Sequence, residues 1–319
     1  MVSTACFVSK SKPPDLLQIM NEITYRHPRE AEIISAFRLI RRSFNNLQLR
    51  SGRQPHDEPS GDVPPLYYHL HRTDYKGCWA AYCGKKMVGF GHALLRGRQW
   101  YLAFLFVDPR FQSRGIGREI LKRCIDYGKS RADSFALCTF PYNEAALGLY
   151  CSFGLMPIYP ILGMKRTEKK ITRVKPTGLR IVEDDSNRSI LRINRLEKEI
   201  RGYSRLADLR FFASQPDYRI CSFYKGSKWI GYSVMHKKSL IGPAGAVRAG
   251  FLPDILTESV RHCVPWQADP VRIFLGGTNE AAYRGLISLG FIIDNLSVFL
   301  STKSYGDFSR YAPAYLAIF

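Results

Sequence analysis

The sequence feature that most constrains this fold is an internal repetition. The stretch GKKMVGF, which starts at Gly84, is matched later by GSKWIGY, which starts at Gly226. The letters NEAA begin at Asn143 and again at Asn279, and they are followed by SFGL in the first copy and SLGF in the second. Similar stretches that recur in one order indicate a duplicated unit rather than coincidence.

We therefore expect two related domains, residues 23–172 and 173–319, after an N-terminal extension of residues 1–22. The chain has 319 residues, 45% of them hydrophobic, which is enough to fill two cores. Apolar residues at three- and four-residue steps between residues 30 and 47 predict an amphipathic helix. The following patterns alternate strands with helices, and WYLAFLFV, apolar on both faces, is typical of a central strand. The predicted class is α/β, built on a mixed sheet.

Charge, hydropathy and cysteine content limit the partners and the cellular compartment that we expect for this chain. It has 47 Lys and Arg against 27 Asp and Glu, a net charge of +20, so a polyanionic partner such as nucleic acid is possible, although no dense basic block supports one. No apolar run is long enough for a membrane helix. The eight cysteines are scattered singly, without metal-ligand spacing, and favour a reducing cytoplasmic location. The oligomeric state stays open.

The junction FVDPRFQSRGIGREIL, from Phe106 to Leu121, joins an apolar strand to a helix through two glycines. The first turn of such a helix leaves backbone N–H groups unpaired at the positive end of the helix dipole, and these groups bind phosphate oxygens. Gly115 and Gly117 lack the Cβ atoms that would keep a pyrophosphate from the backbone, and Arg114 and Arg118 add charge. The spacing is neither that of a Walker A loop nor that of a dinucleotide fingerprint.

Two motifs together resemble the acyl-CoA site of the GNAT acetyltransferase superfamily. The first is Gln112-x-x-Gly115-x-Gly117 after a strand, and the second is Asn143 at the start of a helix with Tyr150 seven positions later. This resemblance implies two GNAT-like domains, each a mixed, mostly antiparallel sheet flanked by helices. It also implies acetyl-CoA as the cofactor and acetyl transfer to a primary amine of a small molecule or peptide.

The resemblance assigns a role to each matching position. The backbone of Leu105, Phe106 and Val107 would pair with the pantetheine arm as an added strand. Asn143 would touch the pantetheine, and Tyr150 would protonate the departing thiolate. The predicted pyrophosphate loop comprises Gln112, Ser113, Arg114, Gly115, Ile116, Gly117 and Arg118.

The general base is not identified by the sequence. Direct transfer requires an uncharged amine, which a carboxylate or an ordered water usually helps to deprotonate. The two positions where GNAT enzymes usually carry that carboxylate hold Cys138 and Ala103. Alternatives are Glu144, a carboxylate at the chain terminus after Phe319, or one of three histidines, namely His69, His71 and His92.

The second copy lacks the phosphate-binding pattern. Its junction reads IGPAGAVRAGFLPDIL, in which we align Pro243 with Pro109, and the position that corresponds to Tyr150 is Leu286. The second domain is therefore predicted not to bind CoA, and its GYSRLADLR stretch either lines an acceptor cleft or forms a solvated helix face. The alternative to an N-acetyltransferase is a non-catalytic module that binds CoA or nucleic acid for regulation.

Overall fold

The computed structural model describes residues 23–55, 62–166, 175–237, 240–263 and 270–319. The predicted N-terminal extension and the predicted domain boundary at residues 172–173 lie outside these ranges. Within them, none of the helices combines the length and apolar content that crossing a bilayer would require.

The two halves of the chain use the same order of elements. The first half contains β1 (Ile23–Arg26), α2 (Ile33–Arg50), α3 (Pro65–Thr73), β2 (Cys78–Cys83), β3 (Lys86–Arg96), β4 (Gln99–Val107), α4 (Ile116–Gly128), β5 (Ser134–Thr139), α5 (Glu144–Cys151) and β6 (Met156–Arg166). The second half contains β7 (Arg180–Glu183), α6 (Asn187–Arg201), α7 (Leu206–Ser214), β8 (Tyr218–Lys225), β9 (Lys228–His236), β10 (Leu240–Ala246), α8 (Leu252–Cys263), β11 (Val271–Gly276), α9 (Glu280–Ser288), β12 (Ile292–Ser301) and β13 (Tyr311–Ala312). The mixed, mostly antiparallel α/β class is confirmed.

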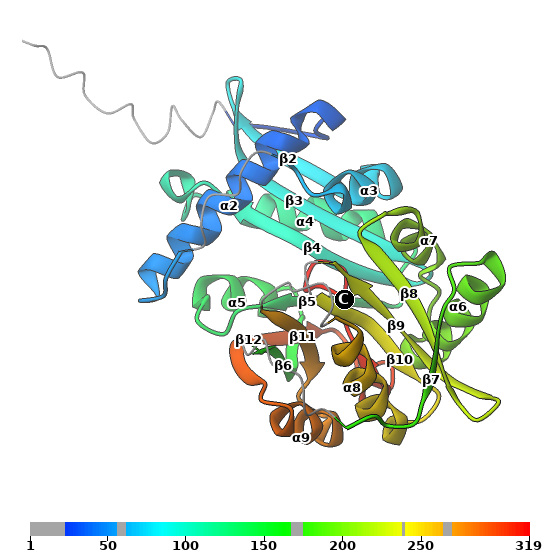
Figure 1. The fold of residues 1–319 in the computed structure, drawn as a ribbon. Helices are drawn as coiled ribbons and strands as arrows, with labels where there is room; N and C mark the ends of the chain where they lie inside the picture. Colours follow the sequence, from blue (N-terminus) through cyan, green and yellow to red (C-terminus); the bar gives the residue numbers. More distant parts are fainter. Residues whose placement is uncertain (1–22, 56–61, 167–174, 238–239, 264–269) are drawn as a thin grey trace, which may run out of the picture.

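The described strands form one 13-stranded sheet rather than two separate sheets, and the halves exchange strands at its centre. The order is β1-β2-β3-β4-β5-β12-β6-β11-β10-β9-β8-β7, with β13 beside β10. Thus β12 of the second half lies between β5 and β6, while β6 of the first half lies between β12 and β11 (Figure 1). Each half completes the sheet of the other.

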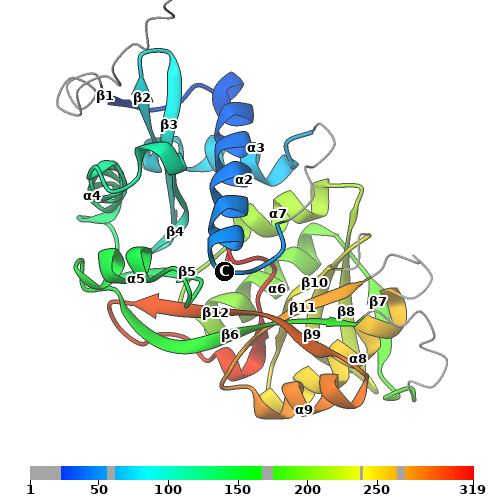
Figure 2. The same cartoon turned by 90° about the vertical axis from the view of Figure 1, so that its left-hand side faces the viewer.

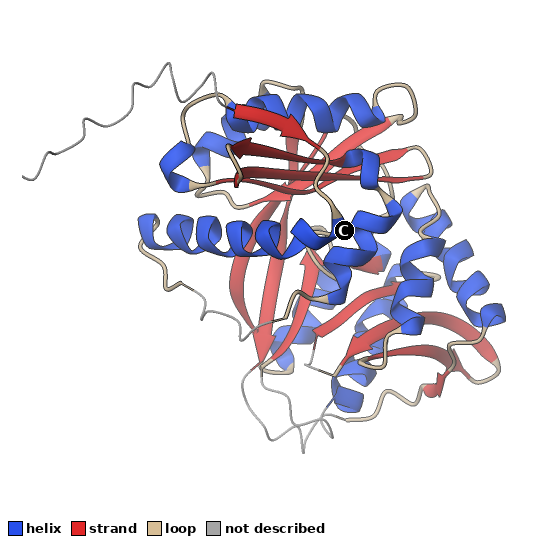
Figure 3. Ribbon diagram, turned by 90° about the horizontal axis from the view of Figure 1, so that it is seen from above, coloured by secondary structure: helices blue, strands red, loops and turns tan. Residues whose placement is uncertain are grey.

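Helices cover both faces of this sheet (Figure 3). On one face, apolar side chains of α2, α3, α6 and α7 meet in a core that both halves share, with Leu39, Leu70, Ile193 and Phe212 fully or almost fully buried. On the other face, α4 and α5 cover the first half, and α8 and α9 cover the second. The amphipathic helix predicted near residues 30–47 is α2, whose buried side chains follow the expected steps.

Two neighbouring strands in each half separate partway along their length. In the first half, β4 and β5 are paired in parallel only from Gln99 with Ser134 to Leu102 with Leu137, so the rest of β4 has an open edge. In the second half, β10 and β11 pair only near Ile241 and Ile273, and β13 then lies against β10. Thus β13 fills the gap beside β10 in the second half, whereas the corresponding gap beside β4 in the first half stays open.

The alignment of Pro243 with Pro109 is wrong. Pro243 lies inside β10, whereas Pro109 follows the end of β4 and begins a 3-10 turn. The mismatch arises because the IGP letters continue a buried strand and do not form a turn, and the strand-to-helix junction of the second half lies further on, between Ala246 and Leu252.

Candidate functional site

A cavity of about 790 Å³ lies where β4 and β5 separate. The cavity reaches both faces of the sheet, because successive side chains of β4 point to opposite faces. Leu105 and Val107 face α4, whereas Phe104 and Phe106 face α2. Figure 2 shows α4 on one side of β4 and α2 on the other. The predicted site residues that line the cavity are Leu105, Phe106, Val107, Gln112, Ser113, Gly115, Ile116, Gly117, Arg118, Asn143 and Tyr150. Arg114 is not among the lining residues, and its guanidinium lies over the ring of Phe111.

The loop that enters α4 has the backbone of an anion-binding turn. Gly115 has φ 77° and Ser113 has φ 60°, both in the left-handed region. A Cβ on Gly115 would meet nothing within 4 Å, and one on Gly117 would reach only ordinary contact with Val107 at 3.6 Å. The first-turn amides of α4 thus border open space in the cavity, where an anion fits.

Asp108 fixes this loop, and our sequence interpretation did not single it out. Its carboxylate accepts hydrogen bonds from the backbone N–H of Arg110 at 3.1 Å and from the guanidinium of Arg42 at 2.8 Å. Burial raises the pKa of Asp108, but these bonds, above all those from Arg110, outweigh burial and lower it to about 2. The Gln112 amide then donates to the Val107 carbonyl at 3.1 Å. Asp108 stands directly before Pro109 at the end of the predicted strand, and this position could have identified it in the sequence as a residue that fixes the loop.

The two repeated asparagines have different surroundings. Asn279 caps α9, because its side chain accepts from Ala282 N at 3.1 Å and donates to the Ser309 carbonyl. Asn143 begins α5 without a side-chain cap hydrogen bond and lines the cavity. The side chain of Asn143 is therefore available to a ligand, whereas the side chain of Asn279 is engaged in hydrogen bonds within the protein.

Tyr150 lies on α5, with only 6% of its surface exposed, and it lines the cavity. Burial raises the pKa of its hydroxyl far above the ordinary value, and Cys124 raises it further. The hydroxyl therefore stays protonated at neutral pH, which is the state that a proton donor requires.

The candidate general bases are not gathered in one place. Glu144 lines the cavity, as do Cys138 and Ala103, whereas the three histidines do not. His92 is buried in the sheet, and burial lowers its pKa to about 4. His71 is bonded to the Pro28 carbonyl at 2.9 Å. The chain terminus, our remaining candidate, lies close by: Leu316 and Ala317 line the cavity, but Phe319 is not among the lining residues.

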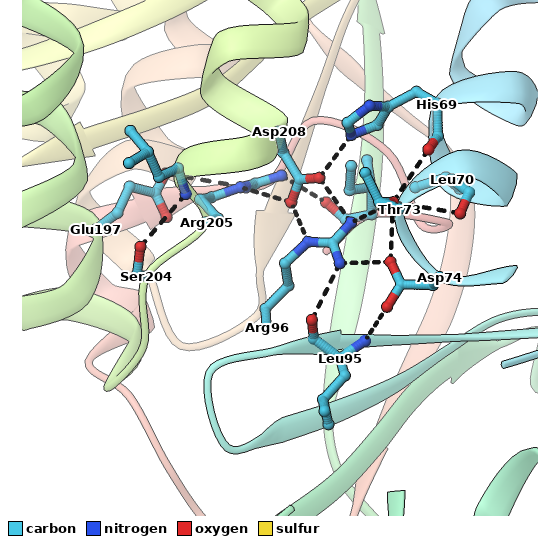
Figure 4. A network of polar contacts seen from close by, with 12 residues as sticks. His69, Leu70, Thr73, Asp74, Leu95, Arg96, Glu197, Ser204, Arg205 and Asp208 are labelled. Atoms are coloured by element: carbon cyan, nitrogen blue, oxygen red, sulfur yellow. Dashed lines mark hydrogen bonds and ion pairs between the residues drawn. The ribbon is translucent and has the colours of Figure 1, made fainter. Parts of the chain in front are cut away.

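The third histidine belongs to a buried ion network between the halves (Figure 4). His69 bonds Asp208 at 2.9 Å, and Arg96 of β3 bonds both Asp208 at 2.7 Å and Asp74 at 2.6 Å. Arg205 and Asp208 are each 1% exposed and do not line the cavity. Both sequence interpretations of GYSRLADLR are therefore wrong for these residues, because Asp208 pairs with His69 and Arg96 of the first half, and Arg205 is buried beside it in the second.

Residues 41–155 match the family model described as the Acetyltransferase (GNAT) family. A thialysine N-epsilon-acetyltransferase of Bos taurus is 24% identical over 143 residues, which are 41% of this chain and 83% of that protein. The enzyme of the same name from Sus scrofa is 31% identical over 77 residues, 22% of this chain, so the match spans less than half, 45%, of its length.

Solved structures resemble nearly the whole chain. A candidate acetyltransferase from Pyrococcus horikoshii has a TM-score of 0.74 at 16% identity and covers 98% of this chain and 100% of its own. A GCN5-related N-acetyltransferase from Sphaerobacter thermophilus has a TM-score of 0.67 at 16% identity, with coverages of 91% and 99%. A tandem GNAT protein from the clavulanic acid biosynthesis pathway has a TM-score of 0.60 at 13% identity, with coverages of 89% and 99%.

The first half of this chain therefore carries a GNAT-family acetyltransferase domain. The chain as a whole has the fold of a tandem GNAT protein, in which the second half repeats the first.

Proposed function

We propose that this protein is an N-acetyltransferase that moves an acetyl group from acetyl-CoA to a primary amine. The observation that carries the proposal is the cavity between β4 and β5, in which the loop at Gly115 and Gly117, the open edge of β4 and Tyr150 lie together. In this proposal residues 23–172 hold the cofactor, and residues 173–319 complete the sheet and contribute to the acceptor side. The bovine and porcine relatives are named for acetylation of an epsilon amine, which supports an amine acceptor.

The residues present fit acetyl-CoA, which supplies an activated thioester when bound. The first-turn amides of α4 and Arg118 would hold the pyrophosphate, as at other helix N-termini. The free edge of β4 from Leu105 to Val107 would pair with the pantetheine amides, and Asn143 would add a side-chain contact.

Tyr150 and the cavity walls would then assist the transfer. When bound, acetyl-CoA would offer its thioester carbon to the amine nitrogen, and the Tyr150 hydroxyl would donate a proton to the sulfur that leaves. The amine loses its own proton to water or to Glu144, the one carboxylate among the described cavity residues. Holding the amine and the thioester in one cavity would also lower the activation barrier, because the two reactants are already close and oriented.

Calorimetric titration with acetyl-CoA tests the cofactor assignment. We expect one site per chain, because β13 closes the corresponding gap in the second half. Gly117→Trp should abolish binding by filling the space beside Val107 and Leu149. Absence of binding by the wild-type chain, or two equivalent sites, would contradict the proposal.

Free thiol release in the presence of amine acceptors then tests the activity. Thialysine is the first acceptor to try, with amino acids, peptides and polyamines in the same panel. Binding of acetyl-CoA without acetylation of any amine would exclude an N-acetyltransferase and leave a cofactor-binding protein.

A further inference from the structure

The cavity contains an apolar recess on the α2 side of the sheet, opposite the phosphate loop. Its walls are Ile40, Tyr67, Phe104, Cys138, Leu316 and Ala317, which we call the acceptor recess. Tyr67 is stacked on Phe104, with ring centroids 4.9 Å apart. The recess begins where β4 and β5 part, so it is continuous with the open edge of β4 that we assign to the cofactor.

The second half of the chain builds one wall of this recess. The Tyr101 hydroxyl donates to the Leu316 carbonyl, and the Arg205 guanidinium donates to the Ile318 carbonyl at 3.1 Å. Phe319 packs on Phe299 with ring centroids 4.8 Å apart. These contacts anchor the segment that contains Leu316 and Ala317.

Charge in the cavity is divided between its two ends. Among the described lining residues, the charged side chains are Arg41, Arg50, Arg118 and Glu144. Arg118 and Glu144 belong to the first turns of α4 and α5, and Arg50 bonds Gln112 of the phosphate loop at 3.5 Å. Burial raises the pKa of Tyr67 to about 12, and Arg41, whose charge acts in the opposite direction, is therefore near this wall of the recess.

We propose that the acceptor recess selects primary amines attached to an uncharged aryl or alkyl body and rejects polycations such as polyamines and aminoglycosides. This inference rests on the proposed function. The body of such an amine replaces water on the walls of Tyr67 and Phe104. A second ammonium group in the recess would lose its hydration near Arg41, and none of the described residues that wall the recess has a carboxylate to pair with it.

The test compares matched acceptors with the full chain at saturating acetyl-CoA. Thiol release gives kcat/KM for phenethylamine and hexylamine, which have one charge, and for spermidine and kanamycin, which have several. We expect the two apolar amines to exceed both polycations by at least about tenfold, because an unpaired charge near a cation is costly in an apolar site. Equal or higher kcat/KM for either polycation overturns the inference.

Two substitutions locate the effect in the recess. Ala317→Phe should raise KM for phenethylamine about tenfold by filling the recess, with the Kd of acetyl-CoA changed less than about twofold. Should this variant lose its fold, Ala317→Val narrows the recess with less added volume. An unchanged KM in a folded variant would show that the amine does not bind there.

The charge of Arg41 is tested by reversal. Arg41→Glu should raise kcat/KM for spermidine relative to phenethylamine about tenfold, and Arg41→Gln should raise it less. The matched control is Arg38→Glu, which makes the same charge change on an exposed position of α2 outside the cavity. Equal shifts in the Arg41→Glu and Arg38→Glu variants would show that net charge, not the recess, sets the preference.

These outcomes separate the inference from the proposed function. Failure of the wild-type chain to bind acetyl-CoA overturns both. Binding of acetyl-CoA with turnover of thialysine or spermidine, but not of the apolar amines, overturns the recess assignment and leaves the acetyltransferase standing.

Discussion

At the scale of single residues, Tyr150 should act through its hydroxyl group. Tyr150→Phe keeps the ring that packs against the core around α4, so the fold and the Kd of acetyl-CoA should change little. Loss of the proton donor should lower kcat by about 100-fold, the lower range for general acid catalysis. Steady-state kinetics with the preferred amine measures this change.

The pH profile of kcat gives a second check on Tyr150. Because burial raises the pKa of this hydroxyl, wild-type kcat should not fall through its deprotonation between pH 7 and about 9. An unchanged kcat for Tyr150→Phe at every pH would show that another group protonates the leaving sulfur.

Asp208 should contribute more to stability than to chemistry. Burial raises its pKa, but Arg96, His69 and Arg205 outweigh burial and hold the pKa well below the ordinary value. Its folded pKa is lowered, so the stabilisation is complete above the unfolded pKa of about 4 and is lost as the pH falls below that value. Asp208→Asn should lower the free energy of unfolding by about 3 kcal/mol at pH 7, because among the described residues Arg96 then keeps one carboxylate partner, Asp74, in place of two.

Denaturant unfolding between pH 2 and 7 measures both effects. The variant should lose less stability than the wild type as the pH falls. Asp126→Asn, at an exposed position of α4, is the control and should change stability by less than about 0.5 kcal/mol. Equal losses in the Asp126 and Asp208 variants would exclude a role for the buried network.

At the scale of elements, the difference between β4 and β10 decides which half binds the cofactor. Both strands diverge from a parallel neighbour, but β13 pairs with β10 at Ala244 and Gly245, whereas β4 is open beyond Leu102. Hydrogen exchange measures this difference directly. Acetyl-CoA should slow exchange of the amides of residues 104–107 that point to the open edge, and it should leave residues 244–246 unchanged.

The second strand serves as the internal control for the first. Equal protection of both segments on adding acetyl-CoA would indicate that β13 is displaced and that the second half also takes the cofactor. No protection of either segment would contradict the pairing of the pantetheine with β4.

At the scale of the whole molecule, the exchange of β6 and β12 makes the halves dependent on each other. Both neighbours of β6 in the sheet, β12 and β11, come from the second half. Residues 1–172 expressed alone should therefore be poorly folded, since β6 loses its partners and β5 loses β12. Co-expression of residues 1–172 with residues 173–319 should restore a complex that binds acetyl-CoA.

Circular dichroism, size-exclusion chromatography and acetyl-CoA titration measure this dependence. The full chain should unfold in one transition, because one sheet and one shared core cross the boundary. A monomeric, folded fragment of residues 1–172 with full acetyl-CoA affinity would show that the halves are independent domains.

Local features of the fold could be predicted from the sequence. Two glycines, an asparagine that opens a helix and a strand-to-helix junction act over a few residues, so these residue types predict the turn at Ser113 to Arg118 and the alternation of helices and strands. The repeated letters likewise indicated the duplication, and the GNAT resemblance is confirmed in the family match of residues 41–155. Tyr150 and Asn143 were found because their spacing is fixed within one helix.

The way in which the halves combine could not be predicted from the sequence and is seen in the three-dimensional fold. Strand pairing joins residues far apart in the chain, so no local pattern predicted that β12 enters the first half or that β13 fills the gap beside β10. Burial is also a property of the whole fold: Arg205 and Asp208 look like surface residues by type, and their mutual pairing makes them interior ones. The tail reaches the cavity for the same reason, because packing across the two halves, not sequence neighbourhood, places Leu316 beside Tyr101.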